Sequence, residues 1–372
     1  MKPNSISRLL AATLLSSSLY PAVACTGITL KSKDGATVVA RTIEWGGTNL
    51  NSQYVIVPRG YTEQSYTPGG TTDGMTFTAR YGYVGLAVEQ KDFVAEGLNE
   101  AGLSAGLFYF PHYGQYESYD ASQKDKSIAD LQLVSWILGE CKNVDDVKKA
   151  VSQVRIINID PRASTVHWRF IDATGRQLVL EVIDGKPMFY ENKLGVLANS
   201  PGFEWHMTNL NNYVNLYPGK TPEHPLGDVE IFSFGVGSGF LGLPGDITSP
   251  SRFVRAAFYQ TTAPQQATAL GTVLQCFQIL NNFDIPIGIE FAPGEIPADI
   301  PSATQWTSTT DITNRIIYYR TMYNSLIRSI NLQTIDFSKV SYQVMPLDRE
   351  KKQAMEEIKI YNQPAINDNS GK

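Results

Sequence analysis

A cysteine stands directly after a run of small residues near the N-terminus, and this arrangement can create a nucleophile. Ala22-Val23-Ala24 has the small-x-small form of a signal-peptidase site, and Cys25 follows it. Cleavage there would make Cys25 the first residue of the mature chain. One residue would then supply a thiol nucleophile and a free α-amino group as its base, so no separate basic side chain is needed.

Residues 1–24 have the organisation of a secretory signal. Lys2 and Arg8 form a positively charged start, residues 9–19 form an apolar stretch too short to span a bilayer, and residues 21–24 form the cleavage region. We therefore expect a bacterial protein that is periplasmic or secreted after cleavage. The alternative is a lipoprotein signal, in which Cys25 would carry lipid and be chemically silent. Ala22 disfavours it, because lipoprotein signals prefer Leu or Val at this position.

Composition favours one acidic domain. The 372-residue chain has a formal charge of −5, which becomes −7 when Lys2 and Arg8 are removed. An acidic chain with no basic cluster argues against a nucleic-acid partner. No later hydrophobic segment approaches the 18 residues of a membrane span. We expect a signal peptide at 1–24, one domain at 25–350 and a polar C-terminal tail at 351–372.

Other residue patterns in the chain do not predict a functional site. Cys141 and Cys276 are expected to be buried thiols, with a disulfide between them as the alternative in an oxidising compartment. The four histidines are widely separated and no G-x-S-x-G occurs, so neither a metal site nor a serine triad is expected. Residues 237–242 match G-x-G-x-x-G, but they lie in a Gly/Pro loop rather than between a strand and a helix.

Hydrophobic periodicity predicts strands, then helices, strands, helices and strands. This order is not a βαβ alternation, and it fits an α+β fold with two stacked antiparallel sheets and helices outside them. Strands are expected within 25–60, around a turn at Asp34-Gly35, and at 93–110, 165–171, 177–183, 188–198, 304–309 and 315–323; helices are expected from Ser127, after the cap residue Asn143, and near 205–216, 251–260 and 265–281.

The first hairpin returns a second strand past Cys25 and brings Arg41 and Glu44 towards it. A cation lowers the pKa of a thiol, and a carboxylate can orient an ammonium group. These two residues are therefore candidates for the machinery around the thiol. The alternative interpretation is an ion pair at the exposed end of a strand.

A series of motifs in a characteristic order resembles the choloylglycine hydrolases, a family that comprises bile salt hydrolases and penicillin V acylases. The resemblance runs from Cys25 to about Ser338 and implies a four-layer αββα N-terminal-nucleophile hydrolase fold. Its landmarks are Cys25-Thr26-Gly27, Arg41-Thr42-Ile43-Glu44-Trp45, Val57-Pro58-Arg59-Gly60-Tyr61, Gly97-Leu98-Asn99-Glu100-Ala101-Gly102-Leu103, Ala198-Asn199-Ser200-Pro201, Ser251-Arg252-Phe253-Val254-Arg255-Ala256 and Ile335-Asp336-Phe337.

The resemblance implies a role for each of five catalytic residues. Cys25 matches the nucleophile and Arg41 the arginine beside the thiol. Glu44 occupies the place of an acidic residue, usually Asp, that holds the α-amino group. Asn199 matches the asparagine whose amide helps to bind the oxyanion, and Arg252 matches a second arginine near the nucleophile. An amide donor suits this role because amide hydrolysis builds negative charge on the carbonyl oxygen.

Two aromatic residues are candidates for substrate binding. Tyr109 falls where bile salt hydrolases usually have Asn and penicillin V acylases often have an aromatic residue, and Trp45 beside Glu44 can line a pocket. The resemblance implies a small-molecule amide substrate, such as penicillin V, a conjugated bile salt or an acyl-homoserine lactone. It also implies no cofactor and assembly as a homotetramer. The rival expectation is a secreted lipoprotein or binding module that retains the fold without activity, and Glu44 in place of Asp is its main support.

Overall fold

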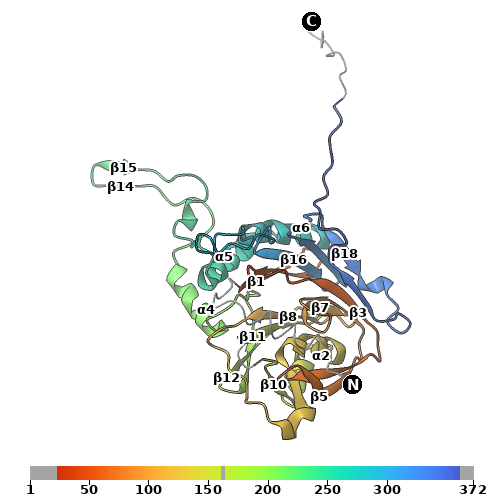
Figure 1. Cartoon of the computed structure of the whole chain (residues 1–372). Coiled ribbons are helices and arrows are strands. Elements are labelled where there is room, and N and C mark those ends of the chain that lie inside the picture. The colour runs from red at the N-terminus through yellow and green to blue at the C-terminus, as the bar shows by residue number, and fades with distance from the viewer. Residues whose placement is uncertain (1–22, 161–163, 361–372) are drawn as a thin grey trace.

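Two antiparallel sheets stack face to face, and helices cover their outer sides (Figure 1). The computed structural model describes residues 23–160 and 164–360, so nearly all of the expected signal peptide and the end of the tail lie outside the described residues. The α+β architecture predicted from the sequence, with two stacked sheets and outer helices, is confirmed.

The first sheet carries Cys25 and has the strand order β1-β2-β16-β17-β18, with every neighbouring pair antiparallel. The predicted turn at Asp34-Gly35 joins β1 to β2, and Gly35 has φ +89°, a conformation that favours glycine. The strands are β1 (Val23–Lys31), β2 (Thr37–Trp45), β16 (Thr304–Asp311), β17 (Ile316–Thr321) and β18 (Arg328–Asn331).

The second sheet is larger, with the strand order β13-β12-β11-β8-β7-β6-β3-β19. Its central strands are buried on both faces, because the first sheet covers one side and helices cover the other. The strands are β3 (Gln53–Val57), β6 (Tyr83–Ala87), β7 (Val94–Asn99), β8 (Ser104–Tyr109), β11 (Val166–Ile171), β12 (Gln177–Ile183), β13 (Lys186–Glu191) and β19 (Gln343–Pro346).

Helices close the outer faces of both sheets. The helices α5 (Ser249–Thr262) and α6 (Ala269–Leu280) contact β1 and β2 of the first sheet, and α2 (Leu133–Glu140) contacts β7 and β8 of the second. The remaining elements are α3 (Val144–Val151), α4 (Phe203–Asn209), the strand pairs β4 (Thr62–Thr67) with β5 (Thr71–Thr78), β9 (Ser127–Ala129) with β10 (Arg155–Ile157) and β14 (His224–Leu226) with β15 (Val229–Ile231), and short 3₁₀ helices at Ala121–Lys126, Asp130–Gln132, Leu210–Tyr213, Ser238–Phe240, Asn281–Phe283 and Leu332–Thr334.

Several boundaries differ from those predicted. The helix expected from Ser127 begins only at Leu133, because residues 127–129 pair with β10 as a parallel strand. The strand expected at 188–198 ends at Glu191, where the Asn192 side chain accepts a hydrogen bond from the Gly195 backbone and closes a turn. The helix expected at 205–216 ends at Asn209 and continues as a 3₁₀ turn. The β4–β5 hairpin was not predicted.

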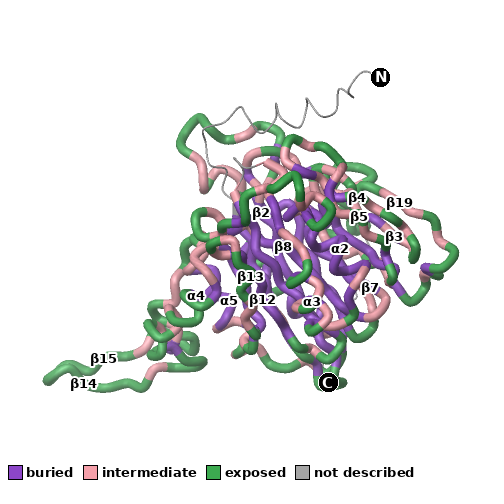
Figure 2. The backbone as a smooth tube through the Cα atoms, turned by 90° about the horizontal axis from the view of Figure 1, so that it is seen from below, coloured by how far each residue is buried: buried purple, intermediate pink, exposed green. Residues whose placement is uncertain are grey.

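The buried residues lie mainly in the two sheets, whereas the β14–β15 hairpin projects from the body as an exposed arm (Figures 1 and 2). All three cysteines are free thiols, so the alternative of a Cys141–Cys276 disulfide is wrong in this structure. Within residues 23–160 and 164–360, no helix is both long and apolar enough to cross a membrane.

Gly97 shows how tightly α2 packs against the second sheet. A Cβ atom at this position would lie 2.5 Å from Leu138 Cδ1 and 2.8 Å from the Val84 carbonyl oxygen. Because the Val84 contact is with backbone, a side chain at position 97 cannot be accommodated by a rotamer change alone.

We predict that Gly97→Ala lowers the free energy of unfolding by about 1–3 kcal/mol, the usual cost of overpacking a core. Chemical denaturation at neutral pH measures this loss. Gly245→Ala is the matched control, because no atom lies within 4 Å of the added methyl group there. Equal unfolding midpoints for the two variants would show that the space beside Leu138 is not limiting.

Candidate active site

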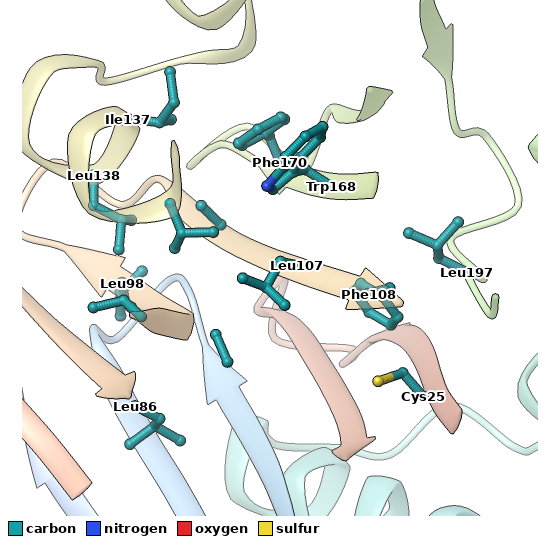
Figure 3. Close-up of a cluster of buried hydrophobic side chains, with 14 of the residues drawn as sticks. Cys25, Leu86, Leu98, Leu107, Phe108, Ile137, Leu138, Trp168, Phe170 and Leu197 are labelled. Carbon is teal, nitrogen blue, oxygen red and sulfur yellow. The ribbon is translucent and has the colours of Figure 1, made fainter. Parts of the chain in front are cut away.

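Cys25 lies on β1 with its sulfur in contact with a buried guanidinium group. In the β1–β2 register Arg41 is opposite Gly27, two residues beyond Cys25, so Arg41 and the thiol share one face of the sheet. Arg41 Nη2 lies 2.8 Å from the Cys25 Sγ atom. Cys25 is only 2 % exposed and lies beside Phe108 at the edge of the buried cluster (Figure 3). Burial raises the pKa of the Cys25 thiol, whereas Arg41 lowers it.

Asn199 binds the backbone nitrogen of Cys25. Its Oδ1 atom accepts hydrogen bonds from the Cys25 nitrogen at 2.8 Å and from Arg252 Nη2 at 2.7 Å. A guanidinium group can only donate, so the contact with Arg252 determines which end of the Asn199 amide is the oxygen. The amide nitrogen, Nδ2, donates to the Tyr109 carbonyl oxygen at 2.7 Å. Asn199 therefore presents an acceptor to the backbone nitrogen and has a second Nδ2 hydrogen available for a substrate.

Arg252 reaches the same strand from α5, on the other side of the sheet. Its Nη1 atom donates to the Cys25 carbonyl oxygen at 2.6 Å and to Thr26 Oγ1 at 2.7 Å, and its Nε atom donates to the Ile247 carbonyl at 2.9 Å. Arg252 is buried. It does not touch the sulfur, so its contacts hold the main chain of the cysteine rather than the thiol.

Glu44 is fully buried and lies opposite Ala24 in the β1–β2 register. Because Glu44 is three residues from Arg41 along the strand, the two side chains lie on opposite faces. Its Oε1 atom accepts a hydrogen bond from Thr304 at 3.3 Å, and its Oε2 atom has no hydrogen-bond partner among the described residues. Burial raises the pKa of Glu44 to about 7, and the opposing effect of Arg252 is smaller.

A cavity of about 200 Å³ lies next to the cysteine. It is lined by Ala24, Pro111, Asn199, Ser200, Ile247, Thr248, Ser249, Arg252 and Ile285. Tyr109 and Trp45 are not in this set. The Tyr109 hydroxyl donates to Ser164 at 2.8 Å, and Trp45 Nε1 donates to Thr48 at 2.9 Å. Their proposed contacts with a substrate stay predictions, whereas the main-chain carbonyl of Tyr109 already takes part in the site through Asn199.

Further residues that support the site were not found from the sequence. The Asn199 backbone nitrogen donates to Ser249 Oγ at 2.9 Å, and His206 Nε2 bonds the Asn199 carbonyl at 2.8 Å. Burial lowers the pKa of His206 to about 4, so the ring is neutral at physiological pH and its Nε2 atom is the donor. No local motif marks these residues, because they reach Asn199 from separate helices.

The fold defines the class: this is an N-terminal-nucleophile hydrolase fold. A solved structure of a conjugated bile acid hydrolase variant from Clostridium perfringens aligns with a TM-score of 0.78 and 29 % identity, covering 90 % of this chain and 100 % of that one. A penicillin V acylase from Agrobacterium tumefaciens aligns with a TM-score of 0.70 and 21 % identity, over 87 % and 92 % of the two chains, and supports the fold.

Sequence comparison identifies the family. Residues 25–345 match the linear amide C–N hydrolases of the choloylglycine hydrolase family, and the chain belongs to this family. A bile salt hydrolase/transferase from Clostridium perfringens is 32 % identical over 316 residues, which cover 83 % of this chain and 92 % of the relative. The protein is therefore a hydrolase of linear amides, as the resemblance found in the sequence implies.

In the chain that retains Ala24, Glu44 makes the free energy of unfolding dependent on pH. Its folded pKa of about 7 lies above the ordinary 4.5, so the unfolded chain releases this proton first as the pH rises. We predict that this form loses stability between about pH 4.5 and 7, by up to about 3 kcal/mol relative to Glu44→Gln. Urea unfolding of both proteins across this range measures the difference. If the free energies of unfolding of the two proteins changed equally with pH, Glu44 would have its ordinary pKa of about 4.5.

Proposed function

We propose that this protein is a secreted amidohydrolase in which Cys25, exposed by removal of residues 1–24, is the nucleophile and its own α-amine is the base. The observation that carries the proposal is the convergence of separate groups on one residue. Arg41 contacts the sulfur, Asn199 the nitrogen and Arg252 the carbonyl oxygen of Cys25. Neither Cys141 nor Cys276 has a comparable environment, and burial raises the pKa of both thiols.

The first half of the reaction forms an acyl-enzyme. The α-amine, whose ordinary pKa is about 7.7–8.0, takes the proton of the thiol near neutral pH. Arg41 stabilises the resulting thiolate, which attacks the substrate carbonyl carbon. Negative charge then develops on the carbonyl oxygen, and the second Nδ2 hydrogen of Asn199 can bind it. Collapse of this intermediate breaks the C–N bond, and the ammonium group returns its proton to the leaving amine.

The second half hydrolyses the thioester. The α-amine, now neutral, takes a proton from water as the oxygen attacks the acyl carbon, and the C–S bond breaks to release the carboxylic acid and the thiolate. Glu44 supports the charged form of the amine in both halves. Its unpartnered Oε2 atom is a buried acceptor, and Glu44 lies opposite the residue whose bond to Cys25 would be cut. The extra methylene relative to Asp does not prevent the carboxylate from lying in this part of the site.

The position of Ala24 supports the requirement for cleavage. Ala24 lines the cavity next to the cysteine and packs against Ile285 and Ala303. Removal of the chain through Ala24 would free the amine and enlarge the space beside it. Cleavage by a signal peptidase would also place the mature enzyme in the periplasm or outside the cell.

The substrates that we propose have an apolar acyl group on a secondary amide. Candidates are penicillin V, glycine- or taurine-conjugated bile salts and acyl-homoserine lactones. The family membership and the mixed lining of the cavity, with Pro111, Ile247 and Ile285 beside Asn199 and Arg252, support this class. The aromatic residue at position 109 favours penicillin V slightly.

We predict that hydrolysis requires a free amine at Cys25. A form that begins at Cys25 should hydrolyse at least one of the three amides, whereas a form with an uncleavable extension should be inactive on all of them. Cys25→Ala should abolish turnover, and Cys141→Ala is the matched control that should retain it. The ratio of kcat/KM values among the three amides then ranks the substrate classes.

The intact mass of the protein exported by a bacterial host tests the rival function. A mass that corresponds to unmodified Cys25 at the N-terminus supports the enzyme. A diacylglyceryl adduct, with no turnover of the three amides, would support the inactive lipoprotein instead. Equal activity with and without the extension would contradict the role of the amine as base.

We further propose that the enzyme assembles as a homotetramer through an arm at residues 224–241, which contains β14 and β15. Two-stranded ribbons are marginally stable alone, yet this one projects from the body (Figure 1). It exposes a series of large apolar side chains that a second copy could cover: Leu226, Val229, Ile231, Phe232, Phe234, Val236 and Leu241.

Replacement of Phe232 and Phe234 by Ser should convert the tetramer into smaller species, because both rings are more than half exposed on the arm. Size-exclusion chromatography with light scattering measures the mass. Leu326→Ser is the control, since Leu326 is 58 % exposed but lies outside the arm. A wild-type monomer, or a double variant that remains tetrameric, would contradict assembly through the arm.

A further inference from the structure

A buried ion pair of Glu96 with Arg169 lies next to Arg41, between the two sheets. Glu96 on β7 is 2 % exposed and Arg169 on β11 is 1 % exposed. Arg169 Nη2 lies 3.4 Å from Glu96 Oε1, and Arg41 Nη1 lies 3.7 Å from Glu96 Oε2. The carboxylate therefore stands between two guanidinium groups, one of which touches the Cys25 sulfur.

The chain leaves space for this pair on both sheets. A Cβ atom on Gly27 would lie 2.6 Å from Arg169 Nη1, and a Cβ atom on Gly106 would lie 2.1 Å from Glu96 Oε2. Arg169 also donates to the Ala40 carbonyl, at 3.4 Å, so it reaches across to the first sheet. Two glycines on neighbouring layers thus make room for the buried charges.

Glu96 is the one carboxylate in ion-pair contact with Arg41 within residues 23–160 and 164–360. The other acceptors of Arg41 are the main-chain carbonyls of Leu107, Ala95 and Thr42, and its guanidinium group lies 4.2 Å from the centre of the Phe108 ring. Three carbonyls can therefore hold Arg41 in place, and Glu96 is the carboxylate placed to offset its positive charge.

Five buried charged side chains either act directly on the Cys25 thiol or belong to the ion-pair chain that starts at Arg41. The cations are Arg41 on β2, Arg169 on β11 and Arg252 on α5, and the carboxylates are Glu44 on β2 and Glu96 on β7. With both carboxylates ionised, a neutral thiol leaves an excess of one positive charge, which a thiolate cancels. The α-amine of the processed chain adds a titrating group to this set. An uncompensated buried charge is costly, so this arrangement favours the thiolate.

We propose that Glu96 and Arg169 are positioning residues that set the ionisation of the Cys25 thiol through Arg41. The proposal rests on the proposed role of Cys25 as nucleophile. Loss of the positive charge of Arg169 leaves Glu96 to attract Arg41 away from the sulfur. Loss of the negative charge of Glu96 leaves both arginines uncompensated except by the thiolate. The two changes should therefore act in opposite directions.

The test measures the pH dependence of Cys25 alkylation by iodoacetamide in the processed protein, followed on the peptide that contains Cys25. Arg169→Met should raise the apparent thiol pKa by about one pH unit, a roughly tenfold loss of thiolate below the pKa, and Glu96→Gln should lower it by a similar amount. The double variant should return close to the wild-type value. The acidic limb of kcat/KM for the best amide substrate should move with the thiol pKa, with KM little changed.

Two controls separate ionisation from folding. Arg169→Lys keeps the charge, so it should retain a thiol pKa near that of the wild type even where its melting temperature falls. Arg176→Met removes an exposed arginine from an ion pair with Glu191 and should leave the thiol unchanged. Single variants that lose thermal stability but keep the wild-type thiol pKa would overturn the proposal. The alkylation rate depends on the thiol and requires no amide turnover. Failure of the proposed function would be a different result, namely amide hydrolysis by Cys25→Ala.

Discussion

The positive charge of Arg41, buried between the two sheets, is the constraint on which the rest of the site depends. Arg41 is fully buried, and desolvation of a guanidinium group costs several kcal/mol unless hydrogen bonds and an anion offset it. The carbonyls of Leu107 and Ala95 and the carboxylate of Glu96 supply this compensation, and all three come from the opposite sheet. The separation and register of the sheets therefore determine where the guanidinium group can meet the sulfur.

The two faces of β1 provide two different environments for one residue. On the inner face the Cys25 sulfur meets Arg41, whose guanidinium group lies over the buried aromatic ring of Phe108. On the other side, Arg252 and Asn199 hold the main chain of Cys25. Alternation along β1 places the Cys25 side chain on the inner face and the next side chain, that of Thr26, on the other face, where Arg252 also contacts it. The thiol and the backbone nitrogen of Cys25, which we propose as nucleophile and base, therefore contact different groups.

Burial has the same effect on the two acidic groups that lie closest to the N-terminal side of the site. It raises the pKa of both the Cys25 thiol and Glu44, which taken alone would keep both protonated. The arginines oppose this effect, because each stabilises an anion in a medium of low dielectric constant. A free α-ammonium group would add to them on the side of Glu44. Desolvation and charge pairing thus oppose each other at this site, and the processing that we propose would add a charge to it.

The sequence determined much of this protein through local rules. The Asp34-Gly35 turn and the alternating strands predicted the hairpin that carries Cys25, and the small-x-small site before Cys25 marked it as a candidate nucleophile. The order of elements predicted two stacked sheets with outer helices. The motifs around Arg41, Asn199 and Arg252 indicated the family. Each of these features lies within a few residues of chain, where turn chemistry and periodicity apply.

Tertiary structure decided what depends on contacts between distant segments. Ser127–Ala129 became a strand because Arg155–Ile157 pairs with it, which no local pattern reveals. In the sequence, Glu96 and Arg169 look like ordinary strand residues. Their ion-pair contacts with each other and with Arg41 form only when three strands from two sheets meet. Tyr109 contributes its main-chain carbonyl, a group that side-chain patterns do not report. Desolvation and ion pairing act through space, so their partners are set by packing rather than by position in the chain.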